Sequence, residues 1–240
     1  MTGTVRKFSA AGTYHISNNI ENQDALSFWD GGRYCAAVLA DGVSSCSRAA
    51  EGAGFIANAM TEWLKNNCGS LFLQRPDRIA EAAADEIQAR LGEYSRSIMC
   101  GAEELSSTLS FVLADRESPR AVCLSLGDGL IISASSRQCR VEIQPDIIIG
   151  GCFTTTTEGF EKVIRCRVIA AEDIHSIAVC SDGAWKAMYD KTRLREDIRT
   201  AFMKNDTEHI FDVLQKSNSF DDLSIIFTEL HPLFGDTEKL

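Results

Sequence analysis

The sequence has no Cys-x-x-Cys pair, although it contains nine cysteines. Zinc ribbons and disulfide frameworks need closely spaced or paired cysteines, so this scatter argues against both. Cys35, Cys123 and Cys180 each lie inside an apolar run, where a thiol behaves as a small core hydrophobe. The cysteines therefore predict a reducing, cytoplasmic setting.

Long apolar runs are also missing. No stretch approaches the roughly 18 apolar residues that a membrane-spanning helix needs. Residues 1–10 contain no apolar core of the kind found in signal peptides. We therefore expect a cytoplasmic protein that has no membrane partner.

Positive charge is scarce, because 24 Lys and Arg residues face 34 Asp and Glu residues and give a formal net charge of -10 at pH 7. Nucleic-acid binders normally present a basic surface that displaces counterions from phosphate, so this balance argues against nucleic acid as a partner. An acidic protein that handles a phosphorylated substrate needs local positive charge, which bound metal ions supply. The acidity is equally consistent with a role in solubility alone.

At 240 residues the chain is long enough for one hydrophobic core, and in the absence of repeats or linkers we expect a single domain, 1–240. Strands are expected at 8–11, 25–29, 33–40, 108–114, 121–126, 130–134, 139–143, 163–170, 174–180 and 223–230. Helices are expected at 47–64, 76–99, 184–189, 194–203 and 208–215, and loops at 13–24 and 145–160. Because the helices cluster instead of alternating with strands, the pattern favours an α+β domain with mostly antiparallel sheets.

Aspartates recur at the ends of the apolar runs. Three runs finish in Asp-Gly, at Asp41, Asp128 and Asp182, and the pair Asp221-Asp222 opens the last run. Carboxylates that converge on one cleft repel one another unless cations lie between them. Oxygen ligands of this kind suit Mg²⁺ or Mn²⁺ better than zinc. Each Asp-Gly taken alone is more often a plain turn, so only the set, in its order and spacing, indicates a metal site.

A series of short motifs runs along the chain from residue 12 to residue 224. The motifs are Gly12-Thr13-Tyr14-His15, Asn22-Gln23-Asp24-Ala25, Leu39-Ala40-Asp41-Gly42-Val43, Ser106-Ser107-Thr108-Leu109, Leu126-Gly127-Asp128, Cys180-Ser181-Asp182-Gly183 and Asp221-Asp222-Leu223-Ser224. In content and order this series resembles the protein phosphatase 2C family. No single motif is specific, whereas the whole set in register is hard to produce by chance.

The resemblance implies an αββα four-layer sandwich, in which two antiparallel β-sheets are flanked by helices and a metal cleft lies at one end. It also implies two Mn²⁺ or Mg²⁺ ions, with a weaker third ion in many members. By the same resemblance the metal ligands are Asp41, which bridges both ions, the Gly42 carbonyl, Asp182 and Asp222, with Asp128 at the third position. Asp24 matches an acidic residue that acts on the second ion through water.

The sequence departs from the family pattern before the first acidic motif, where most members carry an arginine that grips the substrate phosphate. Here 17–20 contains no arginine, and Asn19 is the candidate in that stretch for contacting substrate. His15 and Gln23 match a bacterial-type branch that also lacks this arginine. We expect His15 to hydrogen-bond phosphate or to act as the acid on the leaving group. The alternative is a loop histidine that packs on Tyr14 and has no chemical role.

The function implied by the resemblance is hydrolysis of phosphoserine and phosphothreonine in proteins by a metal-activated water. We expect a monomeric enzyme that opposes a Ser/Thr kinase. Residues 145–160 fall where the family carries a mobile flap over the cleft, so substrate preference is expected to reside there. Two alternatives stay open on the sequence. One is a catalytically weak or silent relative that binds partner proteins. The other is a different metal-dependent phosphoesterase that acts on small phosphates or on nucleic acid, of which the acidic composition disfavours nucleic acid.

Overall fold

Strand β3 (Tyr34–Asp41) shows how the sequence builds the layers of the fold. In the computed structural model, which describes residues 5–146 and 151–230, Val38 and Ala40 pack against helices. Ala37 and Leu39 pack instead against a second sheet. Successive side chains of a strand point to opposite faces, so this unbroken run of apolar residues is buried on both sides. β3 is therefore a central strand of a layered core.

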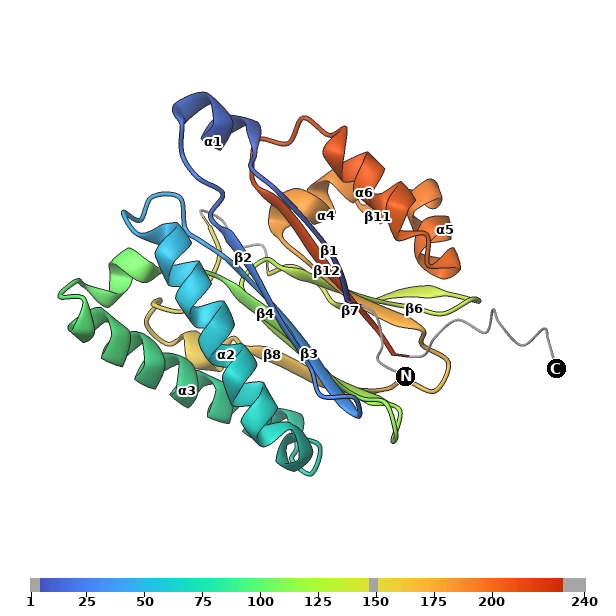
Figure 1. Cartoon of the computed structure of the whole chain (residues 1–240), viewed down its shortest axis with the longest axis horizontal. Coiled ribbons are helices and arrows are strands. Elements are labelled where there is room, and N and C mark those ends of the chain that lie inside the picture. The colour runs from blue at the N-terminus through green and yellow to red at the C-terminus, as the bar shows by residue number, and fades with distance from the viewer. Residues whose placement is uncertain (1–4, 147–150, 231–240) are drawn as a thin grey trace.

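Two five-stranded antiparallel sheets stack face to face (Figure 1). One has the strand order β2-β3-β4-β5-β8 and the other β1-β12-β9-β6-β7. Besides β3, their strands are β1 (Val5–Ala10), β2 (Asp24–Asp30), β4 (Leu109–Asp115), β5 (Arg120–Leu126), β6 (Leu130–Ala134), β7 (Cys139–Ile143), β8 (Arg165–Ala170), β9 (Ser176–Cys180) and β12 (Leu223–Glu229). A separate small hairpin joins β10 (Tyr189–Asp190) to β11 (Arg193–Leu194).

Helices cover both outer faces of the stacked sheets (Figure 1). The helices on the sheet that contains β3 are α2 (Ala49–Leu71) and α3 (Pro76–Ser97). Those on the other sheet are α4 (Asp182–Met188), α5 (Glu196–Lys204) and α6 (Thr207–Gln215). A short helix, α1 (Thr13–Asn18), and two 3-10 helices, Ala102–Leu105 and Phe160–Lys162, lie in connections. The expected αββα four-layer sandwich is thereby confirmed.

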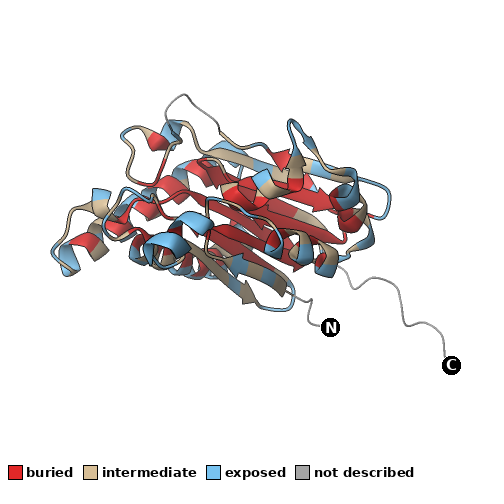
Figure 2. Ribbon diagram, turned by 90° about the horizontal axis from the view of Figure 1, so that it is seen from above, coloured by how far each residue is buried: buried red, intermediate tan, exposed pale blue. Residues whose placement is uncertain are grey.

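Three layers of buried apolar side chains separate these four layers. Figure 2 shows the buried residues concentrated along the middle of the molecule, with exposed residues on the outer helices and the loops. Because burial of apolar surface is the dominant favourable term in folding, the sandwich is stabilised along its length. Its ends are therefore able to carry polar and charged groups. Within 5–146 and 151–230, no helix combines the length and the hydropathy that crossing a membrane demands.

The structure differs from the sequence prediction at 13–24, where a loop is expected and α1 forms instead. The Thr13 N–H donates to the Ser219 carbonyl at 2.9 Å, so a distant segment satisfies the first turn. Asn19 ends the helix in the left-handed conformation, at φ 54°, which asparagine tolerates. A helix of six residues is too short to show an apolar stripe, so tertiary contacts decide it.

Smaller differences concern boundaries. α2 continues past the predicted end at residue 64, because Leu71 extends its buried stripe. The hairpin of β10 and β11 escapes prediction, since two-residue strands carry no periodic pattern. Of the expected loop at 145–160, residues 147–150 lie outside the described residues, and a 3-10 helix begins at Phe160.

Two glycines of α2 provide a test of the packing. A methyl group added at Gly52 would overlap the carbonyl oxygen of Leu105, whereas one added at Gly54 meets open space. We predict that Gly52→Ala lowers the free energy of unfolding by about 1–3 kcal/mol, because the helix must move away from the backbone on which it packs. Gly54→Ala should be neutral or stabilise by up to about 1 kcal/mol, because alanine favours a helix. Urea denaturation followed by circular dichroism measures both, and a fully stable Gly52→Ala protein would contradict this packing.

Candidate metal centre

The acidic residues noted in the sequence fall at one end of the sandwich. Asp41 ends β3 and Asp24 begins β2, and antiparallel pairing sets the two directly opposite each other. Asp182 follows β9, while Asp128 precedes β6 and Asp222 precedes β12, the two strands that pair with β9 in antiparallel register. The chain direction of the paired strands therefore brings carboxylates from both sheets to the same edge.

A cavity of about 310 Å³ lies at this end and is lined by residues from both sheets. Its lining includes His15, Asp41, Gly42, Asp128, Asp182, Asp221 and Asp222. The structure thus brings together every metal ligand predicted from the sequence, with His15 beside them. Asn19 is not among the lining residues, and its side chain is exposed at the end of α1. Asp24 does not line the cavity either, and its carboxylate oxygens are buried.

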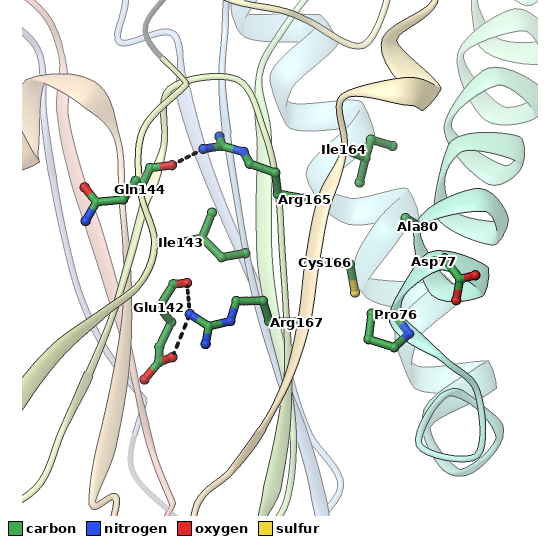
Figure 3. A pocket seen from close by; sticks show the side chains of 10 residues that line it. All are labelled: Pro76, Asp77, Ala80, Glu142, Ile143, Gln144, Ile164, Arg165, Cys166 and Arg167. Atoms are coloured by element: carbon green, nitrogen blue, oxygen red, sulfur yellow. Dashed lines mark hydrogen bonds and ion pairs between the residues drawn. The ribbon is translucent and has the colours of Figure 1, made fainter.

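A larger cavity, of about 570 Å³, lies between α3 and the strands β7 and β8 (Figure 3). Its two arginines donate hydrogen bonds to neighbouring backbone carbonyls. Arg167 donates to the Glu142 carbonyl at 2.7 Å, and Arg165 donates to the Gln144 carbonyl. Because this cavity gathers no carboxylate cluster, the acidic cavity is the better candidate for chemistry.

Burial and repulsion from neighbouring carboxylates raise the pKa of three of the clustered carboxyl groups, Asp24, Asp41 and Asp128. Burial raises the pKa of Asp24 to about 7, with the charges of Asp222 and Asp182 adding to the rise and the Ser224 hydroxyl opposing it. Burial, followed by repulsion from Asp24 and Asp182, holds the pKa of Asp41 well above its usual range. A bound cation would relieve this repulsion, because it favours the ionised form of every carboxyl group around it.

Several buried polar atoms near these carboxylates have no hydrogen-bond partner among the described residues. They include both carboxylate oxygens of Asp24, Oε1 of Gln23 and Nε2 of His15. Buried polar groups in proteins are nearly always paired, and Mg²⁺ or Mn²⁺ with its water shell supplies such partners. In the described part of the chain, no three acidic, histidine or cysteine side chains already surround one point. The carboxylate and carbonyl oxygens at this cavity are nevertheless the type of ligand that suits hard divalent cations.

Asp222 is held in place by three donors. Its Oδ1 accepts from the Gly12 N–H at 2.7 Å and from Nδ1 of His15 at 2.8 Å, and its Oδ2 accepts from the Gln23 N–H at 2.7 Å. The side chain is only 4% exposed. Asp222 therefore connects α1, the start of β2 and the start of β12, and most of its acceptor capacity is used in doing so.

His15 is oriented by this contact. A carboxylate partner on Nδ1 assigns the proton to that nitrogen, which leaves Nε2 as the acceptor in the neutral ring. Nε2 is buried without a partner among the described residues, and His15 lines the cavity. The ring also packs on Tyr14, with centroids 5.6 Å apart. His15 therefore both packs on Tyr14 and lines the cavity. The residue lies in a helix and not in the expected loop.

Asp221 and Lys186 belong to the site although neither is among the site residues predicted from the sequence. Asp221 lines the cavity with a side chain that is 43% exposed, and it lies 3.1 Å from Nζ of Lys186. The same Nζ lies 2.6 Å from Asp182, one helical turn earlier on α4. The i, i+4 spacing of Asp182 and Lys186 is the signal in the sequence that could have placed Lys186 at the site. Gly183 lets the start of α4 pack closely on the backbone of Asp222, because a methyl group at this position would overlap the Asp222 carbonyl.

Cys152 is a further lining residue that the sequence did not single out. Burial, followed by the negative charges of Asp128 and Asp41, raises the pKa of its thiol to about 12. The thiolate is the nucleophilic form of cysteine, so these carboxylates disfavour the reactive form of Cys152. The chemistry of the cavity therefore depends on its carboxylates and on His15.

Solved structures share this fold. A bacterial serine phosphatase superposes with a TM-score of 0.67 at 14% identity, covering 95% of this chain and 98% of that chain. RsbX in complex with magnesium gives a TM-score of 0.62 at 14% identity, with 95% of each chain covered. The serine/threonine phosphatase Stp1 from Staphylococcus aureus gives a TM-score of 0.64 at 13% identity, covering 97% of this chain and 96% of that chain. No curated protein sequence matches this chain.

A sequence profile of a family described as Protein phosphatase 2C matches residues 11–217. The match begins just before His15, includes Asp24, Asp41, Asp128 and Asp182, and ends before β12. It covers most of the chain, and the αββα sandwich agrees with it. The chain belongs to the protein phosphatase 2C family.

Proposed function

We propose that this protein is a metal-dependent phosphatase that acts on phosphoserine and phosphothreonine in proteins. The observation that carries the proposal is the cavity where Asp41, Asp128 and Asp182 meet from both sheets, beside the unpartnered oxygens of Asp24. Family membership supports the same activity. Among the similar structures, RsbX is described in complex with magnesium and Stp1 as a serine/threonine phosphatase.

Two Mn²⁺ or Mg²⁺ ions would be held by Asp41, the Gly42 carbonyl, Asp182 and Asp221, with Asp24 acting through water and Asp128 serving a third ion. The sequence alone points to Asp222 in place of Asp221. Both residues line the cavity. We favour Asp221 because the oxygens of Asp222 already accept three donors, whereas Asp221 is 43% exposed and shares the Lys186 ammonium group with Asp182. Asp222 then contributes by orienting His15.

When bound, such ions supply positive charge for the phosphoryl oxygens and activate water at neutral pH. The carboxylates of the chain balance the charge of the ions, so that a phosphate dianion enters without large repulsion. His15 lines the cavity, its Nδ1 is held by Asp222, and its Nε2 has no partner among the described residues. When protonated, Nε2 is the atom that gives a proton to the departing serine or threonine oxygen.

The proposal includes a cellular setting. The enzyme acts as a monomer in the cytoplasm on a phosphorylated protein and opposes a Ser/Thr kinase. The net charge of -10 supports a protein substrate over nucleic acid.

A second candidate is a catalytically weak or silent relative that binds partner proteins. One observation favours it, because Lys186 already neutralises part of the charge of Asp182 and Asp221. Manganese-dependent hydrolysis of a phosphothreonine peptide separates the two candidates.

Asp41→Asn tests the metal centre. We predict a loss of at least about a hundredfold in turnover of a phosphothreonine peptide, because the substitution removes a charged ligand between the two sheets. Asp212→Asn is the matched control, since Asp212 forms an exposed pair with Lys216 on α6. Circular dichroism checks that both variants fold, and near-normal turnover in Asp41→Asn would exclude the proposed centre.

His15→Asn tests the acid, because the asparagine amide keeps a donor where Nδ1 meets Asp222. A serine oxygen leaves poorly without a proton, whereas p-nitrophenolate leaves readily. We predict that turnover of a phosphoserine peptide falls by about 10²–10⁴-fold, with a much smaller loss for p-nitrophenyl phosphate. Equal losses for the two substrates would assign His15 to phosphate binding or to structure.

The stability of the metal-free protein should depend on pH in an unusual direction. The pKa of Asp24 rises from 3.8 to about 7 on folding, so the folded state binds more protons than the unfolded state between these values. The stability that Asp24 contributes in its protonated form is fully present below pH 3.8 and is lost as the pH rises through about 7. We predict a lower Tm at about pH 8 than at about pH 6 in EDTA, and recovery in Mn²⁺, which favours the ionised carboxylates. Asp24→Asn should flatten the dependence, and no pH effect in wild type would contradict the prediction.

A further inference from the structure

Lys186 places an ammonium group between two carboxylates of the acidic cavity. Its Nζ lies 2.6 Å from Oδ2 of Asp182 and 3.1 Å from Oδ2 of Asp221. Asp182 and Lys186 are one turn apart on α4, so the helix itself holds the lysine close to its partner. Part of the positive charge that this cavity needs is therefore built into the chain.

The ammonium group and a divalent cation make conflicting demands on these oxygens. Mg²⁺ and related ions bind carboxylate oxygens directly, at about 2.0–2.6 Å, and use their lone pairs. An ammonium group hydrogen-bonded to the same oxygens occupies part of that space and repels a second cation. Oδ2 of Asp182 and Oδ2 of Asp221 are the two atoms over which the competition takes place.

We propose that Lys186 is an internal competitor of the metal, which a divalent cation must displace in order to bind Asp182 and Asp221. The inference rests on the proposed function, because it takes the acidic cavity as the metal centre. Displacement requires little rearrangement, since the lysine side chain is 49% exposed and its flexible stem can carry the charged group into solvent. Lys186 thereby weakens the affinity of the site for metal and neutralises the two carboxylates when no metal is bound.

The test measures Mn²⁺ binding by isothermal titration calorimetry, which needs no substrate and no activity. Lys186→Met keeps the length of the side chain and removes its charge. Lys216→Met is the matched control, because Lys216 forms the same i, i+4 pair with Asp212, at 2.7 Å, on α6. We expect Lys186→Met to bind Mn²⁺ at least about tenfold more tightly than wild type, as removal of a nearby like charge predicts, and Lys216→Met to bind as wild type does.

An unchanged or weaker affinity in Lys186→Met overturns the inference and leaves the proposed function intact, provided that wild type binds Mn²⁺. If neither protein binds Mn²⁺ at millimolar concentration, the proposed function fails and the inference fails with it.

Thermal unfolding gives a second measurement. In EDTA, Lys186→Met should have a lower Tm than wild type, because Asp182 and Asp221 then repel each other. Addition of Mn²⁺ should raise the Tm of Lys186→Met by more than it raises the Tm of wild type. An equal rise in both proteins also counts against the competitor role. Lys186→Gln replaces the methionine variant if the latter does not fold.

Discussion

Repulsion among like charges at one end of the sandwich is the constraint on which the rest of the structure depends. Asp24 and Asp41 face each other across paired strands, and burial raises the pKa of both. Such an arrangement persists only where other interactions outweigh it. Three apolar layers, between helices and sheets and between the sheets themselves, do so along the length of the molecule. The fold is thus a frame that keeps these acidic groups close together, as the proposed metal centre requires.

Two adjacent aspartates take different tasks within this frame. Asp222 is buried, accepts three hydrogen bonds and fixes the orientation of His15. Asp221 stays half-exposed at the cavity and meets Lys186. A carboxylate saturated by fixed donors is a poor metal ligand but a good support for a histidine. The site therefore combines a preorganised part, around Asp222, with an adjustable part around Lys186.

The sequence predicted the features that repeat along the chain. The strands and the two long helices show clear periodicity, and the order of the motifs identified the family. The same motifs singled out Asp41, Asp128 and Asp182, which the fold brings to one cavity. The sequence could not predict features set by contacts between distant segments. α1 forms because its first turn is satisfied by Ser219. Both aspartates at 221–222 line the cavity, and sequence alone cannot tell which of them is held by fixed donors and which stays half-exposed. Asn19, expected to contact substrate, ends α1 and is not among the residues that line the cavity, so its role stays a prediction.

Pairing between β1 and β12 has a consequence for synthesis. The hydrogen bond between Gly12 and Asp222 joins residues 210 positions apart, and β1 finds its partner strand equally late in the chain. Contacts of such long range form slowly and cannot form at all on a ribosome until β12 has emerged. A nascent chain that lacks β12 therefore holds neither the fixed histidine nor the complete set of carboxylates, so the acidic cavity is assembled only at the end of synthesis.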